Sequence, residues 1–486
     1  MYSDELNSSL NFNSTAISSI FKHNENFVKR DIFISENIPC QIIYISGIAD
    51  KKEIQEIILK PLLNLPIPNK DIDLIDEVCK RYIYASDITT TNSIKTICSE
   101  VLNGKCAILI DGSDKAILCD VKSSNYRAIQ ESTTEKSILG SKEAFVENIE
   151  INITMIQRKI KNPNLKTENF IIGTETNTQI AITYIDGIID PKVLDKIKTK
   201  LLNISVPIIN SSGFIEQLLD TRWYNIFPIA KTTEKPDKVA LDLVKGKAAI
   251  LIAEYPGALV VPGTFLEFFQ GAEDYSDKVV IASFSRLLRL IAIITIIILE
   301  PIYLALLYYN PELFPYELIS IIISSRQNIP LPPLLEIFAM DLAVEILREG
   351  GIRLPTPIGT TLAIVGGIVI GESATKAGLV SNITLFIVAM TVISTFLIPN
   401  YQMTLSIRFI RFPLLLLAQL FGFLGILSGL YFFILILTKM DNFGVEYFSP
   451  FMPMRLSDIY DTIIRGPLNK VLKPPKSLQG SNRTKN

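Results

Sequence analysis

The chain has 486 residues, 48% of them hydrophobic and 20% charged, with a formal net charge of −2. This balance, without a basic patch that carries interleaved aromatic residues, gives no reason to expect a nucleic-acid partner. The single histidine, His23, and the absence of Walker A, Gly-x-Ser-x-Gly and H-E-x-x-H motifs argue against hydrolysis and phosphoryl transfer. We therefore expect that the protein is not an enzyme and needs no cofactor or metal.

The first part of the chain, residues 1–30, is rich in Asn and Ser and lacks the apolar core of a signal peptide. We expect it to be a mobile tail. The sequence that follows, as far as Ser283, is charged and periodic like that of a soluble protein, and we expect it to stay in the cytosol.

This cytosolic part contains an internal repeat. The segment YISGIAD, residues 44–50, returns as YIDGIID, residues 184–190. Further on, GKCAILI, residues 104–110, returns as GKAAILI, residues 246–252. The offsets of 140 and 142 positions are nearly constant, which favours two α/β subdomains of like topology.

We place the two subdomains at residues 31–140 and 166–282, joined by an amphipathic connecting helix within residues 141–165. In each subdomain a strand that contains Tyr44 or Tyr184 is expected to lead through a glycine turn into a helix, and two adjacent strands are expected later. The fold class is therefore an α/β soluble region of two repeated subdomains, followed by a membrane domain.

Residues 283–438 are predicted to form an all-α multi-span membrane domain, because charged residues become rare after Ser283. Arg286 and Arg289 precede the first apolar stretch and place its start in the cytosol. An even number of crossings would return the basic C-terminal tail, residues 439–486, to the same side. Four crossings are expected, at residues 287–308, 357–371, 379–398 and 413–437.

This topology leaves one conflict, because the loop that contains Arg408 and Arg411 would lie on the outer side. We expect these two arginines either to reach the membrane interface or to pair with an acidic cluster in the preceding segment. In that segment, residues 334–353, a helical period places several charges together. Its members, with one acid from the next span, are our candidate ion-pathway residues: Glu336, Asp341, Glu345, Arg348, Glu349, Arg353 and Glu372.

Asp341, Glu345, Arg348 and Glu349 follow one another at i, i+4, i+7 and i+8 and are expected to share a helix face. Two interpretations stay open: an interfacial amphipathic helix with a solvated charged side, or a pore vestibule or interhelical ion-pair network.

Small residues recur in the predicted spans and favour close helix packing or a flexible gate. In one span they follow at four-residue spacing, and in the last span they come in a pair: Gly359, Ala363, Gly367 and Gly371, then Gly425 and Gly429.

Four runs of sequence resemble the A subunit of the GerA-type spore germinant receptors. They are EYPG at 254–257, LREGGIRLP at 347–355, IVGGIVIG at 364–371 and AGLVS at 377–381. The similarity covers nearly the whole chain. It departs from the family at Leu139-Gly140-Ser141-Lys142, where the family usually has Arg-Gly-Pro-Arg, and at Gly350, where it has Ala.

The resemblance implies a multi-pass receptor subunit in the inner membrane of the spore. Its partners would be a transporter-like B subunit that binds the nutrient and a C subunit that is a lipoprotein. The family is thought to form a nutrient-gated ion channel, so we expect the chain to be a homo-oligomeric pore-forming subunit. The alternatives are a secondary transporter and a membrane scaffold.

Overall fold

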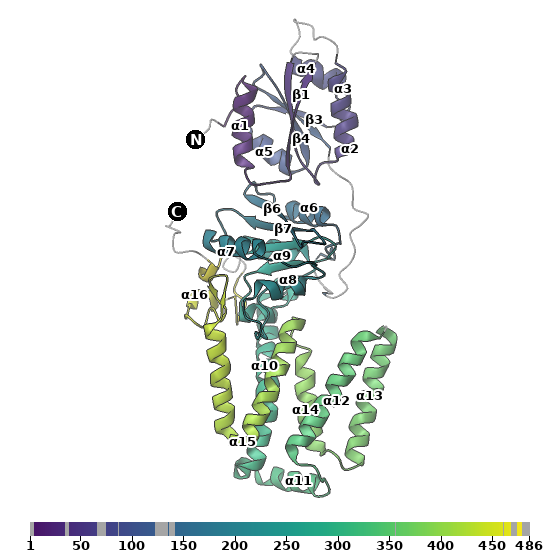
Figure 1. Cartoon of the computed structure of the whole chain (residues 1–486), viewed down its shortest axis with the longest axis vertical. Helices are drawn as coiled ribbons and strands as arrows, with labels where there is room; N and C mark the ends of the chain where they lie inside the picture. Colours follow the sequence, from purple (N-terminus) through teal and green to yellow (C-terminus); the bar gives the residue numbers. More distant parts are fainter. Residues whose placement is uncertain are drawn as a thin grey trace.

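The computed structural model describes residues 4–34, 38–65, 74–85, 87–121, 135, 141–354, 356–459, 461–467 and 474–478. Two α/β subdomains follow one another along the long axis of the molecule, and a helical domain lies beyond the second (Figure 1). The predicted α/β region followed by helices is therefore confirmed.

The two subdomains have the same sheet. The strand orders are β1-β2-β4-β5-β3 and β6-β7-β9-β10-β8, and neighbouring strands are antiparallel. Tyr44 on β2 and Tyr184 on β7 hold equivalent positions, as the repeat predicts. The strands are β1 Phe27–Ile34, β2 Ile38–Ile45, β3 Ile88–Thr91, β4 Lys105–Ile110, β5 Ala116–Asp120, β6 Leu165–Ile172, β7 Thr178–Ile185, β8 Lys231–Thr233, β9 Ala248–Ile252 and β10 Ala258–Val261.

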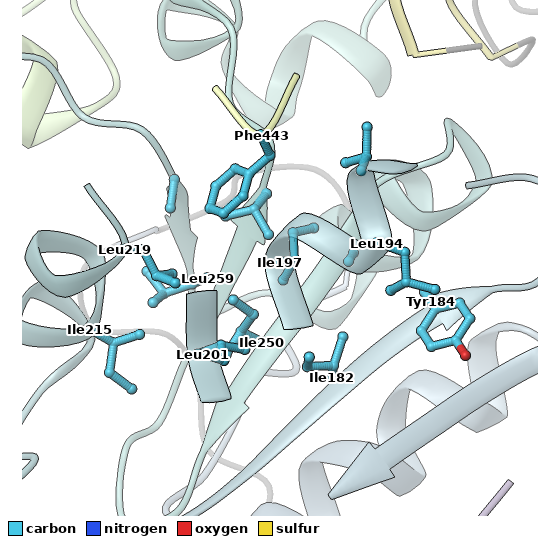
Figure 2. Close-up of a cluster of buried hydrophobic side chains, with 14 of the residues drawn as sticks. Ile182, Tyr184, Leu194, Ile197, Leu201, Ile215, Leu219, Ile250, Leu259 and Phe443 are labelled. Carbon is cyan, nitrogen blue, oxygen red and sulfur yellow. The ribbon is translucent and has the colours of Figure 1, made fainter. Parts of the chain in front are cut away.

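Helices cover both faces of each sheet, because alternate side chains of the central strands point to opposite sides. On β9, Ile250 faces one core and Leu251 the other. In the second subdomain, α7 and α8 pack on one face and α6 and α9 on the other. Figure 2 shows the first of these cores, where α7 and α8 meet the sheet. The helical segments of the subdomains are α1 Leu10–Ile20, α2 Lys51–Glu53, η1 Ile54–Leu59, α3 Lys60–Leu63, α4 Leu74–Glu77, η2 Val78–Tyr82, α5 Ile94–Leu102, α6 Ile149–Lys159, α7 Pro191–Leu202, α8 Ser212–Leu219 and α9 Pro236–Val244.

The repeat extends further toward the N-terminus than expected. Helix α1 precedes β1 as α6 precedes β6, and Ile17 of α1 is fully buried in the core of the first subdomain. Asn13 on α1 and Asn152 on α6 are both buried, and each exchanges two hydrogen bonds with the backbone of the residue six positions earlier. Residues 10–20 are thus a packed helix, which does not fit the expected mobile tail. Equally, the connecting helix α6 is the second copy of this element.

The helical domain starts with α10 Val279–Tyr308, and α11 lies across the end farthest from the sheets (Figure 1). Within the described residues, α10 and α15 are long and apolar enough to cross a membrane, and α14 is apolar but shorter. The remaining helices are α11 Tyr316–Arg326, α12 Pro333–Arg353, α13 Thr356–Lys376, α14 Asn382–Thr395 and α15 Tyr401–Lys439.

Helix α15 is a hairpin of two arms, 401–421 and 423–439, and not the single predicted crossing at 413–437. At Gly422 the backbone leaves the helical region, with φ 58° and ψ −135°, a conformation that side-chain-bearing residues disfavour. The ring of Tyr309 packs against this turn. The first arm therefore begins, and the second arm ends, at the end of the helical domain that is nearest to the sheets, as Figure 1 shows.

The described part of the C-terminal segment packs onto the rest of the protein instead of forming a free basic tail. Phe443 lies in the core of the second subdomain (Figure 2), and Tyr447 is buried beside the start of the helical domain. The guanidinium of Arg465 donates hydrogen bonds to the carbonyls of Tyr275 and Asp277. The segment includes β11 Asp441–Asn442, β12 Val445–Glu446, α16 Leu456–Ile459 and η6 Lys476–Leu478.

Candidate functional site

A buried arginine joins three helices in the middle of the helical domain. The guanidinium of Arg411, on the first arm of α15, lies 3.2 Å from Glu300 of α10 and 3.0 Å from Asp341 of α12. The three side chains are at most 2% exposed. Burying a charge costs free energy of desolvation unless an opposite charge pairs with it. Removing one member of this triad would therefore leave an unpaired buried charge and destabilise the fold.

A second group of charges continues from this triad toward the sheets. Arg408, one turn before Arg411 on the same arm, lies 2.9 Å from Glu345. Arg348 lies 3.9 Å from the other oxygen of Glu345 and donates a hydrogen bond to the hydroxyl of Thr395 on α14. The structure therefore confirms that Arg408 and Arg411 pair with the acidic cluster. The two arginines lie within the first arm of α15 and not in a loop.

A third pair lies closer to α11. Glu336 is buried, 2.8 Å from Arg326, and accepts hydrogen bonds from the amide of Ser381 and the hydroxyl of Thr384. The Ser381 hydroxyl also caps the first turn of α14 by accepting from the Thr384 amide. Glu336 therefore fixes the start of α14 against α12.

The other predicted pathway residues lie outside this cluster. Glu349 pairs with Arg353, and Glu372 pairs with Lys376, in exposed contacts one helical turn apart. Eight helical positions rotate a side chain by roughly 80° from its starting direction. For this reason Glu349 leaves the face that Asp341 and Glu345 share.

The cluster is formally neutral. We name the triad, the Glu345 group and the separate Arg326–Glu336 pair together the buried ion-pair network. It comprises four carboxylates and four guanidiniums: Glu300, Glu336, Asp341, Glu345, Arg326, Arg348, Arg408 and Arg411. Of the two open interpretations, this arrangement is an interhelical ion-pair network. Our site prediction did not include Glu300, Arg326, Arg408 and Arg411. The available signal was that Glu300 stands alone in an apolar run and therefore needs a partner.

A cleft of about 990 Å³ opens beside one end of the network. Glu345 and Arg408 line it on the helical side, and α8 with the following loop, residues 220–229, lines it on the subdomain side. Glu216 of α8 closes one wall, where it accepts hydrogen bonds from the Ile229 and Ala230 amides and from the side chain of Gln402. The network is thus connected to the surface between the two domains.

The predicted small residues occupy different surroundings. A Cβ atom on Gly359 would lie 3.0 Å from the carbonyl of Gly351 on α12, whereas one on Gly367 would meet no atom of the described residues within 4 Å. Gly371 faces Leu385 of α14 at an ordinary contact distance. Ala363 belongs to α13, and its side chain is outside the described part of the structure.

The two glycines of the last span lie in the hairpin. Gly425 faces the backbone of Leu417, and Gly429 faces the side chains of Leu414 and Leu417, all on the opposite arm. Leu139 and Gly140, in the segment where the sequence differs from the family pattern, lie outside the described residues, as does Pro355.

Comparison with known proteins gives a consistent answer over nearly the whole chain. The family model described as Bacillus/Clostridium GerA spore germination protein matches residues 15–477. Spore germination protein KA of Bacillus subtilis (strain 168) is 35% identical over 94% of this chain and 84% of its own length. Spore germination protein A1 of the same organism is 34% identical over 96% of this chain and 94% of its own length.

A solved structure is also similar, the N-terminal domain of the A subunit of the Bacillus megaterium spore germinant receptor GerK3. It is 28% identical, with a TM-score of 0.43, over 55% of this chain and 99% of that domain. From the family model and the relatives, the chain belongs to the GerA spore germination protein family.

Proposed function

We propose that this chain is the pore-forming subunit of a nutrient-gated ion channel that triggers germination, assembled as a homo-oligomer in the inner spore membrane. It would act with a nutrient-binding B subunit and a lipoprotein C subunit. In this arrangement α10 and α15 cross the membrane, further passes come from α12, α13 and α14, and the α/β subdomains lie in the cytosol.

The observation that carries the proposal is the buried ion-pair network beside the domain-boundary cleft. Ionisable groups at membrane depth are costly and usually serve a polar pathway or an interhelical pair. Here Glu345 is the carboxylate that both belongs to the network and lines the cleft. If Arg408 moves away, this carboxylate becomes available to a cation, which is how acidic groups favour cation passage.

The multi-pass arrangement has separate support from the two ends of the helical domain. Arg286 and Arg289, in the second and third turns of α10, are both held by Asp274 of the second subdomain. The second arm of α15 ends at Lys439, directly before Phe443 enters the core of the same subdomain. The proposed topology places both ends on the cytosolic side, which agrees with the basic residues found there.

The test is an ion-flux measurement on the receptor rebuilt from its three subunits in liposomes loaded with potassium. Glu345→Gln removes the charge at the cleft and leaves the guanidinium of Arg408 without its counterion. We expect nutrient-induced efflux to change at least several-fold, while the amount of assembled receptor stays near that of the wild type. Glu349→Gln is the matched control, since this carboxylate lies on the same helix but is exposed.

Equal efflux in both variants and in the wild type would contradict the channel proposal for this site. The charge balance of the network also favours a second function, a membrane scaffold that holds its partners in place. A scaffold predicts that Glu345→Gln lowers the amount of assembled receptor, and that the efflux per assembled receptor is unchanged.

A further inference from the structure

The loop after α8 exposes aromatic side chains that nothing in the protein covers within the described residues. Trp223 is 94% exposed and Tyr224 is 67% exposed, with their rings edge to face at 5.8 Å. Trp223 is the only tryptophan of the chain. Trp and Tyr gather where membrane meets water, since their rings are apolar and their polar atoms stay hydrated.

Contacts with α15 fix the position of this loop. The hydroxyl of Ser406, in the second turn of the first arm, donates a hydrogen bond to the carbonyl of Ile226. Trp223 lines the domain-boundary cleft together with Phe409 and Phe412 of the same arm. Phe409 is itself exposed. The loop that carries Trp223 and Tyr224 therefore lies beside the exposed apolar surface of α15, at the end of the first arm that is nearest to the subdomains.

A basic groove of about 560 Å³ adjoins the loop. Four cationic and two acidic side chains line it. The cations come from α7, from the loop and from the last residue of α15. The charged residues are Lys196, Lys200, Arg222 and Lys439, with Asp195 and Asp441. Arg222 lines both this groove and the cleft. The groove thus lies at the same boundary as the exposed aromatic rings.

Of the cations of the groove, Arg222 pairs with Asp220 at 3.4 Å, whereas Lys200 forms no ion pair among the described residues. The ammonium of Lys200 donates to the carbonyl of Leu219 and lies 4.6 Å from the centre of the Phe443 ring. Burial lowers the pKa of Lys200, and the nearby Arg222 and Lys196 act in the same direction, whereas Asp220 and Asp441 oppose them. An anion in the groove would offset this crowding of positive charge.

We propose that the loop 220–226 and the basic groove form a docking surface for the anionic phospholipid headgroups of the bilayer around the protein's own helices. In this arrangement Trp223 and Tyr224 enter the interface beside α15, and the groove binds a headgroup phosphate. The surface would hold the second subdomain at a fixed height above the membrane. This inference depends on the proposed insertion of α10 and α15.

The single tryptophan provides a direct test on the full-length protein in nanodiscs. We expect lipids brominated near the headgroup to quench Trp223 emission, and brominated phosphatidylglycerol to quench more than brominated phosphatidylcholine at the same mole fraction. The control moves the tryptophan to an exposed aromatic position of the first subdomain, as Trp223→Phe with Phe33→Trp. Emission from that control should be insensitive to both lipids.

The preference for phosphatidylglycerol tests the groove. Each lysine near an anionic surface contributes about fivefold to binding, so Lys196→Gln with Lys439→Gln should remove most of the difference between the two brominated lipids. Lys52→Gln, on α2 of the first subdomain, should leave it unchanged. Free glycerol phosphate should not compete. If it abolishes the preference, the groove is a site for a soluble phosphate and the lipid proposal is wrong.

Membrane insertion is measured separately by resistance to carbonate extraction. A chain that resists extraction while Trp223 is quenched only by soluble acrylamide would overturn the docking surface and leave the proposed insertion standing. A chain that carbonate extracts would overturn the insertion itself.

Discussion

Arg411 is the residue on which the helical domain depends most at the scale of single side chains. Its two partners come from helices far apart in the sequence, with Glu300 separated from it by 111 positions. Because all three charges are buried, the network ties α10, α12 and α15 to one another. An exposed pair such as Glu349 and Arg353 has no such effect, since water screens both charges.

Arg411→Gln should therefore destabilise the protein by about 3–5 kcal/mol, because Glu300 and Asp341 lose their shared counterion. Thermal unfolding of the purified chain in detergent would measure the loss. The double variant Arg411→Gln with Glu300→Gln should recover part of it, as one unpaired charge is also removed. Arg353→Gln is the control, with an expected effect of about 0–1 kcal/mol. Equal effects of Arg411→Gln and Arg353→Gln would show that the buried network does not stabilise the fold.

Neighbouring glycines on α13 have opposite roles at the scale of secondary-structure elements. A Cβ on Gly366 would lie 2.7 Å from the Leu347 side chain of α12, whereas a Cβ on Gly367 would face open space as far as the structure describes the subunit. Close packing between α12 and α13 thus uses Gly359 and Gly366, and not the complete four-residue series that the sequence suggested. The face with Gly367 stays available to another copy of the chain.

Substituting Gly366 and Gly367 separately by leucine compares a packed position with an open one on the same helix. Gly366→Leu should disturb the α12–α13 contact and destabilise the isolated subunit by about 1–3 kcal/mol through overpacking. Gly367→Leu should leave the isolated subunit unchanged and should reduce oligomer formation if that face lies between subunits. Thermal unfolding and native mass spectrometry would separate the two effects. Full assembly of Gly367→Leu would place that face against lipid.

The sequence predicted those elements whose signals are local. Repeated motifs such as YISGIAD identify the second strand of each sheet, because the same short pattern forms the same strand and turn twice. Helix α1 does not follow from the sequence pattern because its Asn and Ser content suggests a tail, although Asn13 and Asn152 are 139 positions apart, close to the repeat offset of 140. The hairpin at Gly422 and the pairing of Arg411 depend on contacts between distant segments, which no local pattern encodes.

At the scale of the whole molecule, the second subdomain holds the helical domain at two places. Asp461 of the C-terminal segment accepts from Lys245 and from Arg286 of α10. On the other side, Glu216 of α8 accepts from Gln402 of α15. A movement of the subdomain would therefore reach both α10 and the arm that carries the arginines of the network.

Glu216, which makes this second contact, gives the stability of the fold a dependence on pH. Burial raises its pKa above the ordinary value of about 4.3, although the bonds from Ala230, Gln402 and Ile229 oppose the shift. A carboxyl group with a raised pKa in the folded state stabilises the fold fully below its ordinary pKa, and this contribution is lost as the pH rises through the folded value. The contribution of Glu216 to the stability of the fold should thus fall from acid toward alkaline pH, because the buried carboxylate loses its hydration, while the hydrogen bond from Gln402 itself favours the charged form.

Glu216→Gln removes the titration but keeps a side-chain oxygen for the Ile229 and Ala230 amides. Thermal unfolding of the full chain at pH 5 and pH 8 should therefore show a larger loss for the wild type than for this variant. Glu216→Ala should cost about 1–3 kcal/mol at both pH values, because two buried amides lose their acceptor. If the wild type and Glu216→Gln lose the same stability between the two pH values, Glu216 does not titrate in this range. Burial of Glu216 would then make no pH-dependent contribution to the stability of the fold between these two values.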